Sequence, residues 1–222
     1  MCQEKYTRLE MTQSNADTSA ELWLNAAYDL LISSGIDAVK VMTLAKHTDL
    51  TRTGFYWHFK DLNAVHECLI DRWEETNTGN LIARSNAPAQ TIAEAMLNVF
   101  DCWYDATLFD APLDLAIRNW ARTDTKVKAR LDAADSIRIN SLAKMFIRFG
   151  YEPADAEVRS LTVIYTQIGY ISMHVTETPQ TRLARAANYV ALFTGVHPTD
   201  RDITVFQQRN RLEFLPNDQL HE

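Results

Sequence analysis

At 222 residues, 46% of them hydrophobic, the chain can bury a substantial core in one large domain or in a small domain plus a larger one. Six glycines and six prolines are too few for a turn-rich β-fold, and no run of about 18 apolar residues or apolar signal-peptide core occurs, so we expect a cytoplasmic helical protein without a membrane span. The formal net charge of −7 argues against a protein that coats nucleic acids non-specifically, because such binding depends on neutralising many phosphates.

The N-terminal residues show no pattern until about residue 20. Residues 1–18 are polar and lack periodicity, so we expect a flexible arm. A helix is predicted over about residues 20–34, and Gly35 is expected to end it. The apolar stripe of this helix consists of Leu22, Trp23, Ala26, Ala27, Leu30 and Leu31.

The stretch from Lys40 to Lys60 predicts two short helices joined by a tight turn. In the first, Val41, Leu44 and Ala45 form an apolar stripe at helical spacing. The pattern breaks at Asp49, so the first helix is expected to end just before this residue.

The second of these helices carries a dense polar and aromatic surface. Thr51 suits its N-cap, since a threonine hydroxyl can accept a hydrogen bond from a backbone N–H that lacks another partner. Leu50 and Phe55 are expected to anchor the helix. The side chains around these anchors are Arg52, Thr53, Tyr56, Trp57, His58 and Lys60. Such a helix suits the DNA major groove, where arginine reads guanine and where hydroxyl groups and lysines bind phosphates. The pattern therefore predicts a helix-turn-helix.

Positive charge is concentrated in the same stretch. Between Ala38 and Lys60 the sequence has four basic residues and one acidic residue, whereas the whole chain carries −7. An acidic remainder combined with a locally basic segment suppresses non-specific binding to nucleic acids. The distribution favours a site-specific protein that binds DNA as a dimer.

The run from Leu50 to Leu62, LTRTGFYWHFKDL, resembles the recognition helix and following turn of TetR-type transcriptional regulators. Those proteins have an apolar residue, a small cap, two variable residues, a small residue, an apolar residue, Tyr, an aromatic residue, His and Phe in this order. Upstream, residues 22–35 resemble the first helix of the family, and residues 44–45 resemble part of its second helix. The resemblance covers about residues 18–78.

Two positions depart from the family pattern. Asp49 stands where the family usually has Gly, but Asp tolerates the left-handed conformation of such a turn. Lys40 stands where the family often has Thr or Ser, and its charge can replace the missing hydroxyl at a phosphate contact. The residues expected to contact DNA are Lys40, Thr51, Arg52, Thr53, Gly54, Tyr56, Trp57, His58 and Lys60.

A longer helix is predicted from about Asp61 to residue 83, as a continuous rod that links the DNA-binding head to the rest of the chain. The residues of its apolar face are Leu62, Val65, His66, Leu69, Ile70 and Trp73. Further helices are predicted, separated by Pro, Asp or Gly, at about residues 90–108, 112–121, 124–149, 154–176 and 180–195. Residues 200–215 have the pattern of one more amphipathic helix, whose role the sequence does not indicate.

The predicted helices 154–176 and 180–195 have the composition of a subunit interface, since small side chains let helices approach closely. The same stripes are compatible with packing inside one subunit. The family resemblance implies dimerisation through these two helices. The expected interface residues are Val158, Leu161, Gly169, Leu183, Ala187, Val190 and Ala191.

The middle helices are rich in aromatic and methionine side chains, which predicts an apolar chamber for a small molecule. Residues of these types also form ordinary cores, so each position alone leaves both readings open. The expected ligand-binding residues are Phe100, Trp103, Tyr104, Trp120, Met145, Phe149, Tyr165, Tyr170 and His174.

Catalytic and metal-binding patterns do not emerge from the sequence. It lacks a phosphate-binding Gly loop, a His-Glu-x-x-His pair, paired cysteine ligands and a G-x-S-x-G turn, so we expect neither an enzyme nor a metal or cofactor site. The pairs Asp101/Asp105 and Asp110/Asp114 are one helical turn apart and are expected to be solvated. A helical ligand-binding or protein-interaction module without DNA affinity remains the alternative. Arguing against it are four residues without an expected core role: Arg52, Tyr56, His58 and Lys60.

These observations predict an all-α protein with an N-terminal three-helix helix-turn-helix head and a C-terminal helical ligand-binding and dimerisation domain. The expected boundaries are an arm at 1–18, the head at 19–78, the regulatory domain at 79–198 and an extension at 199–222. The resemblance implies a homodimeric repressor that binds a near-palindromic double-stranded DNA operator. Release from DNA is expected to follow binding of a small apolar or amphipathic effector, with no membrane partner.

Overall fold

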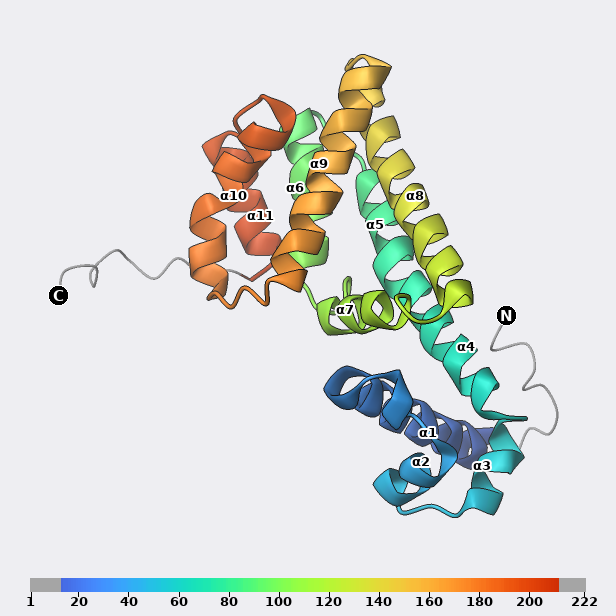
Figure 1. Cartoon of the computed structure of the whole chain (residues 1–222). Helices are drawn as coiled ribbons and strands as arrows, with labels where there is room; N and C mark the ends of the chain where they lie inside the picture. The colour runs from blue at the N-terminus through green and yellow to red at the C-terminus, as the bar shows by residue number, and fades with distance from the viewer. Residues whose placement is uncertain (1–12, 212–222) are drawn as a thin grey trace. The chain divides into compact units, whose positions relative to one another are not determined.

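The computed structural model describes residues 13–211, with side chains from Ser19 onward, and all regular structure in this range is helical (Figure 1). The predicted all-α fold is confirmed. The described residues form two compact units. The first contains the described residues up to Glu75 together with Asp110–Ala133, and the second contains Thr76–Phe109 together with the described residues from Ala134 onward. No helix among residues 13–211 is long and apolar enough to cross a membrane.

The first unit contains most of the N-terminal helices. In chain order these are α1 (Gln13–Ser34), the 3-10 turn η2 (Ile36–Ala38), α2 (Val41–Thr48), α3 (Arg52–His58), α4 (Leu62–Trp73), α7 (Ala111–Trp120) and the start of α8 (Thr125–Arg148). Helix α1 begins at Gln13, within the segment expected to be an arm; residues 1–12 lie outside the described range.

Helix α1 ends as the sequence predicts. Gly35 has φ 79° and its N–H donates to the Leu31 carbonyl at 3.1 Å, which closes the last turn. Trp23 and Leu31 of the predicted stripe are fully buried. Leu22 is instead largely exposed, because its position on the helix turns it away from the side that carries Trp23.

The turn between α2 and α3 is left-handed at Asp49, with φ 55° and ψ 31°. The Leu50 N–H donates across it to the Ala45 carbonyl at 3.1 Å. Asp reaches this conformation with less strain than most residues other than glycine. The expectation that Asp49 can replace the usual glycine is confirmed.

The segment predicted as one continuous helix over 61–83 is helical from Leu62 to Ser85 but changes its hydrogen-bonding geometry. Asp61 caps α4 by accepting from the Ala64 N–H at 2.9 Å. Residues Glu74–Gly79 then form a π-helical stretch, η3, before α5 (Asn80–Ser85). The boundary between the two units lies within η3, after Glu75. The predicted helix over about 61–83 is thus continuous, but apolar spacing does not indicate its local change to wider hydrogen-bonded turns.

Helix α7 is held in the first unit by Asp110, which is half-buried, and by Asp114, which is buried. Asp110 caps the helix and accepts from the Tyr28 hydroxyl at 2.7 Å. Asp114 is fully buried and accepts from Trp73 Nε1 at 2.8 Å and from Arg118 Nε at 2.7 Å. The expectation that Asp114 is solvated is wrong, because its hydrogen-bond partners offset the loss of water.

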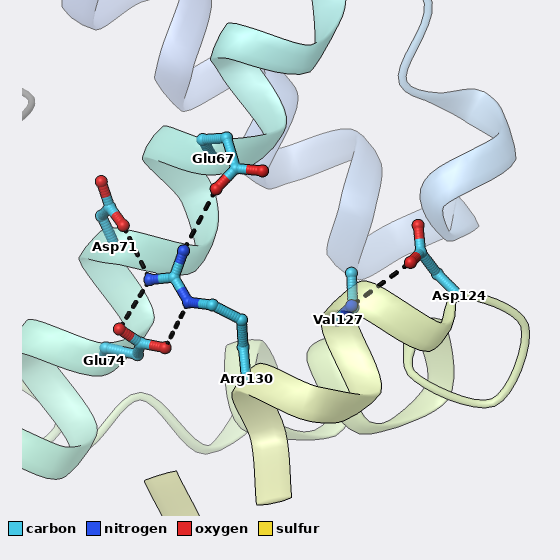
Figure 2. Close-up of polar contacts among 6 residues, drawn as sticks. All are labelled: Glu67, Asp71, Glu74, Asp124, Val127 and Arg130. Atoms are coloured by element: carbon cyan, nitrogen blue, oxygen red, sulfur yellow. Dashed lines mark hydrogen bonds and ion pairs between the residues drawn. The ribbon is translucent and has the colours of Figure 1, made fainter. Parts of the chain in front are cut away.

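The start of α8 is tied to α4 and η3 by Arg130 (Figure 2). Its guanidinium donates to Glu67 at 3.1 Å, to Asp71 at 2.8 Å and to both oxygens of Glu74 at 2.7 and 2.6 Å. The hydrogen bond to Glu74 is the main cause that raises the pKa of Arg130 above its ordinary value. Asp124 begins α8 by accepting from the Val127 N–H at 3.2 Å (Figure 2). The cluster fixes α8 to α4 within the first unit.

The second unit is built around α6 (Ile92–Tyr104), whose residues from Ile92 to Cys102 are buried except for Glu94. Helices α5, α10 (Pro179–Thr194) and α11 (Asp200–Arg209) pack against α6, and α9 (Pro153–Ser172) packs against α10 (Figure 1). Helix α11 ends at Arg209, so the predicted helix over 200–215 is shorter, and its last residues lie outside the described range.

Asp101 of α6 is a second aspartate whose burial the sequence spacing did not predict. It is buried and binds Arg209 Nε at 2.9 Å and Arg84 Nη1 at 3.3 Å, while Asn210 Nδ2 donates to it at 2.8 Å. The expectation of a solvated Asp101 is wrong, because residues far away in the sequence provide its charged partners. Only Asp105 of this pair is exposed, where it accepts from Thr107.

Candidate functional site

Helix α3 is positioned by one cap and two buried rings. The Thr51 hydroxyl accepts from the Gly54 N–H at 3.1 Å, which confirms the predicted N-cap. Phe55 is fully buried and meets the Trp23 ring edge to face, with centroids 5.4 Å apart. Phe59 is also buried and lies 5.5 Å from Phe55. These contacts use the apolar side of α3 and leave its other side to solvent.

The solvent side of α3 brings the predicted DNA-contacting residues together. Six of them, Thr51, Arg52, Thr53, Tyr56, Trp57 and Lys60, are exposed. Trp57 is 82% exposed, which an indole ring with a core role would not be. Gly54 and His58 are half-buried, and Lys40 is exposed at the start of α2.

The chemistry of this surface fits the major groove of DNA. A guanidinium, hydroxyl groups and an ammonium group are donors for base edges and phosphates, and the flat rings of Tyr56 and Trp57 offer apolar contact. Sequence reasoning missed Met42, whose side chain is 63% exposed in the first turn of α2. The signal was available, because Met42 lies on the polar side of the stripe formed by Val41, Leu44 and Ala45.

A cavity opens in the second unit between α6, α9 and α10, with ≈ 530 Å³ of empty space that includes its open mouth. Four of the predicted ligand residues line it: Phe100, Trp103, Tyr104 and Tyr170. The sequence did not single out four further lining residues, Glu177, Arg182, Arg185 and Tyr189. Arg182, Arg185 and Tyr189 belong to the predicted helix 180–195, and Glu177 to the turn before it. Polar side chains at such positions are ordinarily solvated, so no sequence signal pointed to them.

The other predicted ligand residues lie elsewhere. Met145 is fully buried, and Phe149 is half-buried beside the Arg148 guanidinium. Tyr165 and His174 are exposed. Trp120 belongs to the first unit, where its ring lies 5.1 Å from that of His66.

Charged and aromatic groups are interleaved in the cavity wall. The Arg182 guanidinium stacks on Tyr104 at 4.8 Å and on Tyr170 at 5.2 Å from the ring centroids. The Tyr170 hydroxyl donates to Glu177 at 2.6 Å, and Arg185 pairs with the same carboxylate. The hydrogen bond from Tyr170, followed by that from Arg185, lowers the pKa of Glu177. Burial raises the pKa of Tyr104 from 10.0 to about 12, so its hydroxyl stays protonated further into the alkaline range than an ordinary tyrosine.

The expected interface residues divide into buried and exposed positions. Leu183 and Val190 are buried within the second unit, while Leu161, Gly169, Ala187 and Ala191 are half-buried. The largest exposed apolar side chains on α9 and α10 are Val158 and Tyr165, each 61% exposed, and Leu192, 70% exposed. Such side chains are the part of the two helices that a partner can cover.

Metal coordination finds no support in the geometry. Among residues 13–211, no group of three or more His, Cys, Asp or Glu side chains is arranged to hold a metal ion.

Comparison with known proteins finds a family match within the first unit. Residues 24–64 match the family described as bacterial regulatory proteins, tetR family. No curated protein matches the sequence significantly.

Solved structures share the fold over most of the chain. GusR from Salmonella enterica is 15% identical, with a TM-score of 0.56, over 93% of this chain and 98% of its own. A transcriptional regulator from Rhodococcus sp. Rha1 is 17% identical, with a TM-score of 0.54, over 86% of this chain and 97% of its own. A candidate TetR-family transcriptional regulator from Mesorhizobium loti is 13% identical, with a TM-score of 0.54, over 87% of this chain and 97% of its own. At such identities the likeness shows the fold.

Proposed function

Because this chain carries a TetR-type helix-turn-helix domain within the TetR-like all-α fold, we propose that it is a sequence-specific DNA-binding transcriptional regulator. The observation that carries the proposal is the division of α3 into two sides. Phe55 is fully buried, while Arg52, Thr53 and Trp57 are exposed on a helix of only seven residues. The apolar side of α3 anchors the helix in the first unit, and its other side exposes hydrogen-bond donors and aromatic rings. Such a surface is suited to contact another molecule.

The exposed residues of α3 have different roles in this proposal. Arg52 and Thr53 lie in the first turn, where side chains of a recognition helix reach base edges. Tyr56, His58 and Lys60, with Lys40 from α2, contact phosphates. Base contacts provide the specificity and phosphate contacts fix the register of the head on the duplex.

The protein acts as a homodimer on a near-palindromic operator. The exposed apolar side chains Val158, Tyr165 and Leu192 support an interface formed by α9 and α10, with the half-buried Ala187 and Ala191 allowing close approach. Two heads then read half-sites about one helical turn, roughly 34 Å, apart, or a multiple of this distance. Dimerisation doubles the number of base contacts, which offsets the weak attraction of DNA for a chain of net charge −7.

A small-molecule effector releases the protein from the operator, so the protein is a repressor. The cavity lined by α6, α9 and α10 supports this part of the proposal. An effector changes DNA affinity only if it binds two conformations of the protein unequally, and a coupling of about 1–3 kcal/mol gives roughly 5- to 150-fold release.

A gel-shift experiment on the DNA that flanks the protein's own gene tests the proposal. We expect one discrete retarded band, competed by the same unlabelled sequence and not by a scrambled one of equal length. The Trp57→Ala variant removes an exposed ring, so it should remain folded, as circular dichroism will check, and should bind more weakly. Retardation that a scrambled sequence competes equally well, or no retardation by the folded wild type, favours the ligand-binding module without DNA affinity.

A further inference from the structure

The ionised residues in the wall of the second unit's cavity carry one more positive charge than negative charge. Its ionised wall residues are Glu177, Arg182 and Arg185. Glu177 and Arg185 form an ion pair and largely cancel each other. Arg182 is half-buried and its guanidinium stacks on Tyr104 and Tyr170, while its charge also helps to lower the pKa of Glu177. Among the described residues it forms no ion pair within 4 Å, so its charge is only partly compensated.

The position of Arg182 in its helix makes this arrangement costly for the protein alone. Thr178 caps α10 by accepting from the Thr181 N–H at 3.1 Å, so Arg182 lies in the first turns of the helix. The N-terminal end of a helix carries partial positive charge and favours acidic side chains, and α10 has none in its first turn. Glu177, directly before the cap, places one carboxylate at this end, but it is shared between Arg185 and Arg182. The excess positive charge at the helix N-terminus therefore favours binding of an anion.

The remaining wall gives the cavity its second property, a flat apolar interior. Phe100 and Trp103 lie 5.1 Å apart in a tilted pair, and Tyr189 stacks on Phe193 at 5.8 Å. All four residues line the same space as Arg182. Inorganic anions gain little from such walls, whereas a ring or flat hydrocarbon gains both burial and stacking.

We propose that the cavity binds an organic anion, a carboxylate with an aromatic or similarly flat apolar body. Arg182 binds the carboxylate, in the manner of a guanidinium fork that donates two parallel hydrogen bonds. Phe100 and Trp103 contact the body of the ligand, and Gln167 offers a side-chain amide at the same wall. If the protein is the proposed repressor, this ligand class is the class of its effector. Binding of the anion itself does not depend on the proposed function; only its regulatory role does.

The charge of Arg182 also determines which ligands bind the cavity poorly. A cation meets the charge of Arg182 in a partly enclosed space, where repulsion is stronger than in water. A neutral ligand of the same shape stacks on the rings but leaves the guanidinium without a counter-charge. Discrimination between a carboxylate and its neutral amide therefore measures the contribution of Arg182.

Isothermal titration calorimetry on the full chain tests the inference with phenylacetate, 3-phenylpropionate and 1-naphthoate, each beside its primary amide. At least one acid should bind at least about tenfold more tightly than its amide. Arg182→Gln should bring acid and amide to equal affinity, whereas Arg201→Gln, an exposed arginine on α11, should leave the ratio unchanged. Trp103→Ala should weaken acid and amide alike.

Equal binding of acid and amide by the wild type, an unchanged ratio in a folded Arg182→Gln variant, or no binding of any acid in the millimolar range overturns the inference. Gel shifts on the same samples separate it from the proposed function. If the anion binds but the protein does not retard DNA, the proposed repressor function is contradicted and the proposed anion site is supported. DNA retardation without anion binding does the reverse.

Discussion

Trp23 of α1 and Phe55 of α3 meet edge to face with ring centroids 5.4 Å apart, and both side chains are completely buried. The two rings join the first helix of the head to the helix that exposes Arg52 and Trp57. Because edge-to-face pairs constrain angle as well as distance, the pair fixes the rotation of α3 about its own axis. The direction in which the exposed side chains of α3 point is thus set by two buried residues.

Phe55→Ala should lower the free energy of unfolding of the first unit by about 3–5 kcal/mol, because it leaves a cavity against Trp23. Trp57→Ala, which removes a ring that is 82% exposed, should change it by less than about 0.5 kcal/mol while weakening DNA binding. Urea denaturation followed by tryptophan fluorescence measures both. Similar losses in the two variants would show that α3 is not anchored through Phe55.

Arg52→Ala should relax sequence preference and cost about 1–3 kcal/mol of specific binding. Lys60→Ala should instead weaken matched and scrambled sites alike and reduce the salt dependence of binding by about one unit. Fluorescence anisotropy at several salt concentrations distinguishes the two effects. If both variants lose affinity equally on matched and scrambled DNA, the division between base and phosphate contacts is wrong.

Leu192→Arg should yield a monomer that keeps its helical circular dichroism and no longer binds the operator. An exposed leucine at 70% accessibility has no core role to lose, whereas a charge in an apolar interface is disfavoured. Val205→Arg makes the same kind of change at an exposed position of α11 and serves as the control. Analytical ultracentrifugation decides, and an unchanged dimer for Leu192→Arg would remove this residue from the interface.

Arg130→Met should destabilise the first unit by about 1–3 kcal/mol, since it leaves Glu67, Asp71 and Glu74 to repel one another without their shared donor. The matched control is Lys128→Met, which breaks the exposed ion pair with Asp132 and should cost at most about 0.5 kcal/mol. Thermal unfolding at low and high salt measures both variants. If both variants lose the same small free energy of unfolding, the Arg130 cluster stabilises the unit no more than an exposed ion pair does.

The stability of the first unit should fall as the pH drops below the ordinary His66 pKa of 6.5. Burial lowers the pKa of His66, against the opposing influence of Asp124. The unfolded chain therefore binds a proton more readily than the folded chain, and this contribution to stability is present above 6.5 and lost as pH falls through the lowered value. In His66→Gln the slope of unfolding free energy between about pH 5 and 7 should be shallower. Identical slopes would contradict the assignment.

Local chemistry made the head predictable from sequence. The cap at Thr51, the left-handed turn at Asp49 and the end of α1 at Gly35 each depend on residues within a few positions. The buried ring of Phe55 follows from apolar spacing in the same short segment.

Long-range partners made the rest unpredictable. Asp114 and Asp101 have the spacing of solvated carboxylates, and only distant residues such as Trp73 and Arg209 show why they are buried. Periodicity likewise predicted that the middle helices carry aromatic faces, but it does not tell a filled core from an open space. For the same reason the sequence did not indicate Arg182 as a cavity residue. Its place in the cavity wall depends on contacts with Tyr104 of α6 and Tyr170 of α9.

The π-helical stretch Glu74–Gly79 has a consequence for the history of the chain. A turn with i→i+5 hydrogen bonds holds one more residue than an α-helical turn of similar height. It is therefore the form in which a helix absorbs a single inserted residue without breaking its backbone hydrogen bonds. Asn77 and Thr78, buried here in place of apolar residues, mark where the hydrophobic repeat slips. Relatives in which one residue is deleted between positions 74 and 79 should have an uninterrupted α-helix and an apolar repeat that runs through this segment without a shift.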